Sequence, residues 1–144
     1  MVKSFLHIGI SVIDLEASIK FYSEIMQMNI EHRATYIGEI IGRIVGVKDA
    51  NLDICVLAKN NLRLELLDYH NDEKKKHNSY PHQDQPGLVH ISFLVDNVDQ
   101  EYERIKAYGY EFNSPPMVAR KNGPKIAYFK GPDNVVIEIY EKNF

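Results

Sequence analysis

Two histidines and two glutamates stand at related places in the two halves of this 144-residue chain. They are His7 and Glu65 in the first half, and His90 and Glu138 in the second. Each lies within a run of aliphatic residues that alternates with the period of a strand. Imidazole nitrogens and carboxylate oxygens together suit zinc, nickel, cobalt, manganese or iron, without distinguishing among them. The four residues therefore predict a site for one divalent metal ion per chain.

Strand alternation explains why these residues are more than scattered surface groups. Any one of them alone would more simply be an exposed polar residue on a solvated sheet face. In the first strand, however, His7 points away from Ile8 and Ile10, which a helix would cover. Carboxylates buried without a partner on the opposite face would cost several kcal/mol each. A cation removes that cost, so four such residues at related positions favour a metal site.

An internal repeat relates the two halves. The run His7–Val12 aligns with His90–Val95 at an offset of 83 residues (90 − 7). Asp14 and Asn97 keep this offset, and each stands where a side-chain oxygen could cap the start of a helix. Apolar residues at helical spacing follow each cap, and Gly109 ends the second helix. These stripes are Leu15, Ile19, Tyr22 and Met26 in the first helix and Val98, Tyr102, Ile105 and Tyr108 in the second.

Short strand-like runs follow each predicted helix. They lie near residues 30–36, 52–58 and 62–69 in the first half and near 117, 125–130 and 135–140 in the second. Turn sequences such as Gly131–Asn134 separate them. The order βαβββ therefore occurs twice, which predicts an α+β fold built from tandem βαβββ repeats.

The repeat also locates an insertion and a linker. Glu65 and Glu138 are offset by only 73 residues (138 − 65), so about ten extra residues belong to the first half, and 38–46 is the obvious place. We expect one domain over residues 1–144, made of modules of about 1–70 and 88–144. A polar linker from His70 to Gly87, which contains the lysines 74–76, would join them.

Composition limits the classes of function. With 44% hydrophobic residues, 26% charged residues and a net charge of −3, the chain has the composition of a globular protein and lacks the basic surface that nucleic acid requires. Nowhere do about 18 apolar residues follow one another, so no membrane span is expected. The N-terminal run Met1–Val12 is expected to be a first strand rather than a secretory signal. The single cysteine, Cys55, is expected to pack in the core and fits a reducing cytoplasm.

Four sequence runs, taken in this order, resemble the vicinal oxygen chelate superfamily. They are His7–Ile10, Leu64–Leu67, Gly87–Ile91 and Gly131–Glu138. This superfamily includes glyoxalase I, methylmalonyl-CoA epimerase, extradiol dioxygenases, and fosfomycin and bleomycin resistance proteins. The resemblance implies that the strands form an eight-stranded cup around the metal, often completed by a homodimer. It also implies that the two histidines and two glutamates are the metal ligands.

The filled ligand positions indicate which branch the chain is most similar to. Glyoxalase I and the epimerase usually offer four protein ligands, whereas the dioxygenases and fosfomycin enzymes usually offer three. Ser11 stands where glutathione-dependent glyoxalases have an arginine, which resembles the epimerase branch more closely. The resemblance thus implies a lyase or isomerase that transfers a proton next to a metal-bound carbonyl. Glu138 is the first candidate for the base, with Glu65 and Asp53 behind it.

Two alternatives remain open at this stage. The chain could be a metal-free protein that sequesters a ligand, as bleomycin resistance proteins do, or an iron-dependent extradiol dioxygenase in which Glu65 is a bystander. The small-molecule substrate would be a compact acyl thioester first and an α-oxoaldehyde thiol adduct second. The polar turn Lys121–Gly123 and Arg43 could also touch a substrate, although a plain hairpin turn and a surface position are the simpler expectations.

Overall fold

The computed structural model describes residues 1–71, 73 and 79–142, which form two compact units. The N-terminal unit is Met1–His77 and the C-terminal unit is Asn78–Phe144, and each is described here by itself. The lysines 74–76 of the expected linker lie outside the described residues. The unit boundary falls inside the expected linker, so residues 79–87 belong to the C-terminal unit. That the two units make a single domain stays a prediction.

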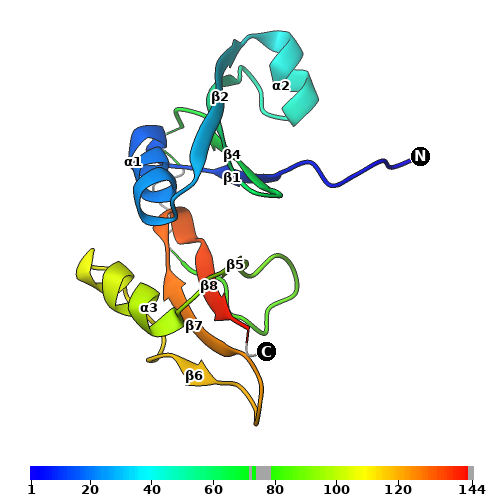
Figure 1. The fold of residues 1–144 in the computed structure, drawn as a ribbon. Helices are drawn as coiled ribbons and strands as arrows, with labels where there is room; N and C mark the ends of the chain where they lie inside the picture. The colour runs from blue at the N-terminus through cyan, green and yellow to red at the C-terminus, as the bar shows by residue number, and fades with distance from the viewer. Residues whose placement is uncertain (72, 74–78, 143–144) are drawn as a thin grey trace. The chain divides into compact units, whose positions relative to one another are not determined.

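The N-terminal unit is a four-stranded sheet with the strand order β1-β4-β3-β2 (Figure 1). Its first and last strands along the chain, β1 and β4, are parallel neighbours, and the other pairs are antiparallel. Helix α1 continues into one π-helical turn and packs against β3 and β4. The elements are β1 (Ile8–Ser11), α1 (Leu15–Lys20), the π turn (Phe21–Ile25), β2 (Asn29–Ile37), α2 (Glu39–Val45), β3 (Asn51–Lys59) and β4 (Leu62–Asp68).

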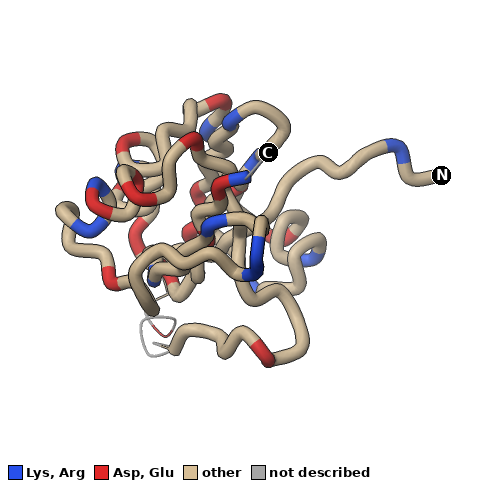
Figure 2. The backbone as a smooth tube through the Cα atoms, turned by 60° about the horizontal axis from the view of Figure 1, so that its bottom comes forward, with Lys and Arg blue, Asp and Glu red and all other residues tan. Residues whose placement is uncertain are grey.

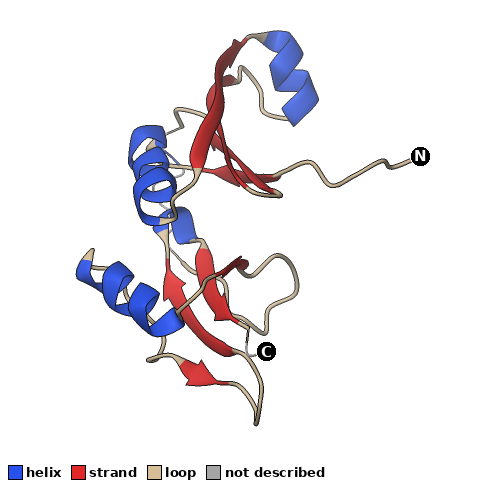
Figure 3. Ribbon diagram, viewed as in Figure 1, coloured by secondary structure: helices blue, strands red, loops and turns tan. Residues whose placement is uncertain are grey.

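The C-terminal unit repeats this plan of a sheet with a helix beside it (Figure 3), and its strand order is β5-β8-β7-β6. Here β5 and β8 are the parallel pair, and α3 packs against β7 and β8. The elements are β5 (Ile91–Leu94), α3 (Val98–Ala107), β6 (Met117–Val118), β7 (Lys125–Lys130), a 3-10 turn (Pro132–Asn134) and β8 (Val136–Glu141). The predicted α+β fold with two βαβββ repeats is therefore confirmed, as two four-stranded sheets.

Both predicted helix caps are present. The Asp14 carboxylate accepts a hydrogen bond of 3.0 Å from the Ala17 backbone N–H. The Asn97 side-chain oxygen accepts one of 2.9 Å from the Gln100 backbone N–H. Both cap residues have extended backbone, as N-caps require. Gly109 follows α3 with a φ of +93°, a left-handed conformation that ends the helix at little cost for glycine.

The core lies between each helix and its sheet. Most of the predicted stripe residues are buried there, including Tyr22, Val98 and Ile105, each with 0% exposure. Leu15 and Tyr102 are half-buried, and Tyr108 is exposed, at 58%, because α3 ends at Ala107 and Tyr108 is its C-cap. Cys55 has 0% exposure, which confirms its predicted core position.

The inserted run 38–46 forms a helix, α2, which the sequence analysis did not assign. The helix begins after Gly38 and ends at Gly46, whose φ of +71° is left-handed. At Gly42 a Cβ atom would lie 2.8 Å from the Val47 carbonyl oxygen, so glycine is needed for the chain to turn back closely there. Arg43 lies exposed on this helix, as expected of a surface residue.

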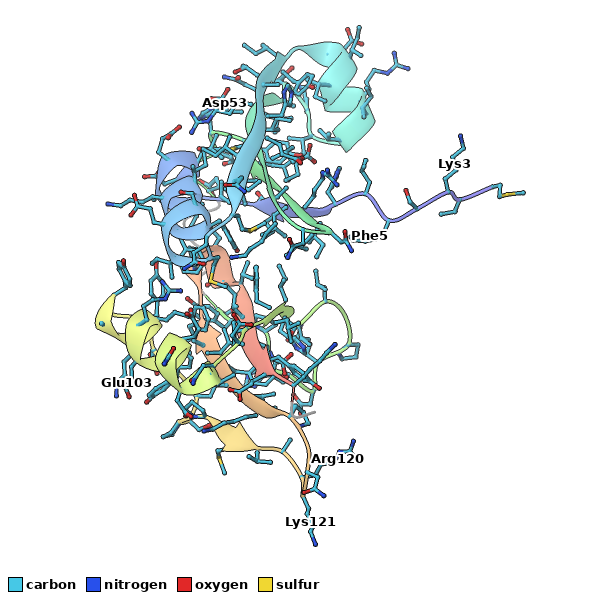
Figure 4. The ribbon with its side chains drawn as sticks, viewed as in Figure 1. Lys3, Phe5, Asp53, Glu103, Arg120 and Lys121 are labelled. Atoms are coloured by element: carbon cyan, nitrogen blue, oxygen red, sulfur yellow. The ribbon has the colours of Figure 1, made fainter. Side chains whose placement is uncertain are left out.

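The expected first strand over Met1–Val12 is too long. The structure limits β1 to Ile8–Ser11, and the preceding residues form an exposed arm from which Lys3 and Phe5 project (Figure 4). The physical reason is the length of the partner strand. Ile8 pairs with Leu64, and β4 begins only two residues earlier, so residues before Leu6 would have no strand to pair with.

The described helices are short, and positively and negatively charged residues are mixed along the chain. Among the described residues, no helix combines the length and apolar character that a membrane crossing would take. Figure 2 shows Lys and Arg interspersed with Asp and Glu along the backbone.

The repeated cap gives a first prediction. Replacing Asn97 with alanine removes the acceptor for the Gln100 N–H, and we expect the free energy of unfolding to fall by about 1 kcal/mol. Urea denaturation followed by circular dichroism measures this loss. Asp96→Ala is the matched control, since Asp96 is exposed and precedes the cap, and its effect should stay within about 0.5 kcal/mol. Equal losses in both variants would contradict the role of the cap.

Candidate metal centre

The N-terminal unit brings His7 and Glu65 together. His7 lies directly before β1, and Gly9, two residues later, is the register partner of Glu65 on the parallel strand β4. The His7 Nε2 and Glu65 Oε2 atoms are 3.2 Å apart. Both side chains are partly exposed, at 34% and 21%. Two of the four predicted ligands are therefore in direct contact.

The C-terminal unit repeats this pair with His90 and Glu138. His90 lies directly before β5, and Ser92, two residues later, is the register partner of Glu138 on the parallel strand β8. The His90 Nε2 and Glu138 Oε2 atoms are 3.8 Å apart. The Glu138 side chain is more buried than that of Glu65, with 10% exposure. The same register thus produces the same histidine–glutamate pair in both units.

The strands position the glutamates by alternation. Glu65 lies between Leu64 and Leu66, which have 0% exposure and belong to the opposite face of the sheet. Glu138 lies between Ile137 and Ile139, which are buried in the same way. Because neighbouring residues of a strand point to opposite faces, packing the aliphatic residues against the helix turns each glutamate to the other face.

Tyr128 joins the C-terminal pair, although the sequence analysis did not single it out. It is the register partner of Glu138 on the antiparallel strand β7. Burial, followed by a hydrogen bond to Glu138 and the charge of that carboxylate, raises the pKa of Tyr128 to about 12. Its ring also meets the His90 ring edge to face, with centroids 5.1 Å apart. The alternating run 125–130 in the sequence indicates a strand. Only the register, however, shows that Tyr128 lies beside Glu138.

Gln83 is a second residue that the sequence analysis missed. Its side-chain oxygen lies 2.8 Å from His90 Nδ1, and its side-chain nitrogen donates to the Val89 carbonyl oxygen at 3.1 Å. Gln83 belongs to the segment expected to be a solvated linker. Tyr80 in the same segment donates a hydrogen bond of 2.7 Å to the Gly131 carbonyl oxygen. These contacts explain why the segment belongs to the C-terminal unit.

Asp53, the third candidate base, lies on the other face of its sheet. Val56 is the register partner of Glu65 on β3, and Asp53 is three residues away, so its side chain points to the face that α1 covers. There its carboxylate accepts a hydrogen bond from the Thr35 hydroxyl and lies 3.0 Å from His70 Nε2. The register therefore places Asp53 and Glu65 on opposite faces of the sheet.

The surroundings of Asp53 agree with this placement. The hydrogen bond from Thr35, followed by the hydrogen bond and charge of His70, lowers the pKa of Asp53. Asp53 also lines a surface hollow of about 300 Å³, together with Leu15, Glu16, Arg33, Ala34, Thr35 and Ile54. Glu16 and Arg33 form an ion pair of 2.9 Å beside it. Asp53 thus belongs to a polar network next to α1.

The remaining weak candidate is the turn Lys121–Gly123. It forms the tip of the hairpin between β6 and β7, where Arg120 and Lys121 project outward (Figure 4). The Gly123 N–H donates to the Arg120 carbonyl oxygen at 2.7 Å, and Asn122 has a φ of +57°. This geometry is that of a hairpin turn, which was the simpler of the two expectations for these residues.

The donor atoms of each pair fit a cation. In both pairs an imidazole Nε2 and a carboxylate oxygen converge, and these are the donors that divalent transition metals bind. Within the described part of the chain, no group of three or more His, Cys, Asp or Glu side chains is gathered closely enough to hold a metal ion. Each unit therefore brings one nitrogen donor and one oxygen donor together.

Comparisons with known proteins agree with this repeat. A solved structure of a glyoxalase family protein from Bacillus cereus is similar with a TM-score of 0.80 and 23% identity, covering 100% of this chain and 99% of that one. The fosfomycin resistance protein FosX from Listeria monocytogenes, crystallised with Mn(II) and sulfate, is similar with a TM-score of 0.61 and 20% identity, covering 98% of this chain and 93% of that one.

Sequence comparison reaches the same family. The uncharacterized protein YwbC of Bacillus subtilis (strain 168) is 26% identical over 143 residues, which cover 99% of this chain and 100% of that protein. The profile of the Glyoxalase/Bleomycin resistance protein/Dioxygenase superfamily matches residues 4–139. This match includes both histidine–glutamate pairs, and the chain therefore belongs to the Glyoxalase/Bleomycin resistance protein/Dioxygenase superfamily.

Proposed function

We propose that this protein is a metal-dependent enzyme that transfers a proton on the carbon next to a carbonyl of a small-molecule substrate. His7, Glu65, His90 and Glu138 are the proposed ligands of one divalent ion per chain. The observation that supports the proposal most is the repeated pair, with donor atoms 3.2 Å apart in one unit and 3.8 Å apart in the other.

The number of donors argues for one shared ion. Protein sites for metals of this kind use three or four protein ligands, and catalytic sites leave a position for water or substrate. A single histidine–glutamate pair falls short of that number, whereas two pairs reach it. Zinc, nickel, cobalt, manganese and iron all accept this mixed nitrogen and oxygen set, and FosX, which shares the fold, was crystallised with Mn(II).

The two carboxylates supply the proton chemistry in this proposal. A divalent ion bound by these residues supplies a Lewis acid for a carbonyl or thioester oxygen. Glu138 is the principal base, because the Tyr128 hydroxyl fixes it and aliphatic neighbours hold its strand in place. Glu65 is the second carboxylate, whose greater exposure suits the return of the proton. A positioned base of this kind contributes on the order of 10²–10⁴-fold to the rate.

The substrate class follows from Ser11. This residue lies in β1, two residues after Gly9, and is uncharged, so it cannot hold a substrate carboxylate as an arginine would. A compact acyl thioester is therefore the first substrate class, and an α-oxoaldehyde thiol adduct is the second. We also place the enzyme in a reducing compartment such as the cytoplasm, because Cys55 is a free, buried thiol.

The first test of this proposal is metal content. We expect the protein loaded with Zn²⁺ and dialysed to retain about one ion per chain, and His90→Ala to lose most of it because one ligand and its pair are lost. Elemental analysis measures both. His82→Ala is the control, since His82 is an exposed histidine of the same unit. Full metal content in His90→Ala, or an equal loss in His82→Ala, would remove the ligand assignment.

The second test is proton exchange. Candidate thioesters and thiol adducts are incubated with the metal-loaded protein in deuterated water, and NMR follows the loss of the α-proton. Glu138→Gln should slow this exchange at least about 100-fold, because the amide cannot accept the proton. Glu103→Gln, an exposed glutamate on α3, should exchange at the parent rate (Figure 4). If no candidate exchanges, or if Glu138→Gln is as fast as the parent, a ligand-sequestering protein becomes the better description.

The third test concerns assembly. We propose a homodimer, because β2 is a long edge strand of the N-terminal sheet and such edges need covering. Light scattering at micromolar concentration should give about twice the 16.6 kDa mass of one chain. A mass equal to one chain would count against the dimer.

A further inference from the structure

We infer that Gln83 is a positioning residue that holds His90 with its proton on Nδ1 and its electron pair on Nε2. Only an unprotonated nitrogen can bind a metal, so this tautomer is the one in which the nitrogen near Glu138 is the ligand. The inference rests on the proposed function for the identity of what binds there. The tautomer itself is a property of the metal-free protein.

The hydrogen bonds of Gln83 determine the tautomer by elimination. The Val89 carbonyl oxygen can only accept, so the atom of Gln83 that faces it is the amide nitrogen, at 3.1 Å. The other atom of the same amide is then the oxygen, which also can only accept. This oxygen lies 2.8 Å from His90 Nδ1, so a neutral His90 donates from Nδ1. The Glu138 carboxylate also only accepts, but at 3.8 Å from Nε2 it lies beyond hydrogen-bond distance, so Nε2 is left without the proton.

The orientation of the ring is fixed as well. The Tyr128 ring meets the His90 ring at 89°, with centroids 5.1 Å apart. With Gln83 holding one nitrogen and Tyr128 lying against the ring, Nε2 is directed to the side where the Glu138 carboxylate lies, 3.8 Å away. Gln83 is itself tied to the backbone through Val89, so this arrangement does not depend on a bound cation.

The two units differ in this respect. Among the described residues, the polar contact of the His7 side chain is with Glu65, whereas the His90 side chain meets Gln83, Tyr128 and Glu138. Residues that orient a metal-binding histidine typically contribute 10–100-fold to metal affinity. The C-terminal pair is therefore the half of the site that is prepared before the metal arrives.

The test is the tautomer of His90 in the metal-free protein, read from its ring ¹⁵N chemical shifts at a pH where the imidazole is neutral. The parent should show the proton on Nδ1. Gln83→Leu should shift the population toward Nε2–H, because the acceptor is gone. Gln83→Glu loses the donor to Val89 but keeps an acceptor for Nδ1, and it should retain the Nδ1–H tautomer. Gln85→Leu, an exposed glutamine in the same turn, should leave the tautomer unchanged.

Zn²⁺ affinity, measured by competition with a chelating dye, gives the second readout. Gln83→Leu should weaken binding by about 10–100-fold, with Gln83→Glu and Gln85→Leu much closer to the parent. A His90 that carries its proton on Nε2 in the parent, or a Gln83→Leu variant with parental tautomer and affinity, would overturn the inference. If the parent shows the Nδ1–H tautomer but binds no Zn²⁺, the tautomer part of the inference stands and the proposed function fails.

Discussion

The parallel pairing of the first and last strands of each unit is the constraint on which the candidate site depends. It places Gly9 beside Glu65 and Ser92 beside Glu138, and so brings a histidine two residues upstream within reach of each glutamate. Parallel neighbours cannot be joined by a tight turn, and they require a long crossover. The helix and the two strands between them supply it. The order βαβββ is therefore the connection that this contact demands, in both units.

The sequence predicts those features that local chemistry controls. Caps at Asp14 and Asn97, alternation around Glu65 and Glu138, and the repeat offset all depend on residues close together in the chain. Asp53 shows where this reasoning ends. In β3 both faces carry buried apolar residues, such as Ile54 and Cys55, so alternation does not reveal which face is covered by the helix. Only the register with β4 separates Asp53 from Glu65.

Other features depend on contacts that have no period in the sequence. Gln83 stands in an irregular segment whose composition is that of a solvated loop, and its role comes from where the backbone places it beside His90 and Val89. Helix α2 depends on glycines at both ends and on the close approach of the Val47 carbonyl oxygen to Gly42. The first strand cannot extend back to Met1, because β4 has no residues before Leu62 to pair with it. Each of these features is determined by contacts with residues elsewhere in the chain, and the local sequence pattern does not show them.

The two pairs share a backbone plan but not their surroundings, and this difference has an energetic consequence. Register alone leaves a histidine with free torsions and two neutral tautomers, and metal binding must then offset the entropy of settling them. Gln83 and Tyr128 settle them for His90 during folding, and Tyr128 also holds Glu138. In the proposed metal site, His7 and Glu65, which are more exposed, would meet that cost on binding the ion. Duplication of one module thus gives two copies of the same histidine–glutamate pair, one held by its neighbours and one with more freedom to adjust.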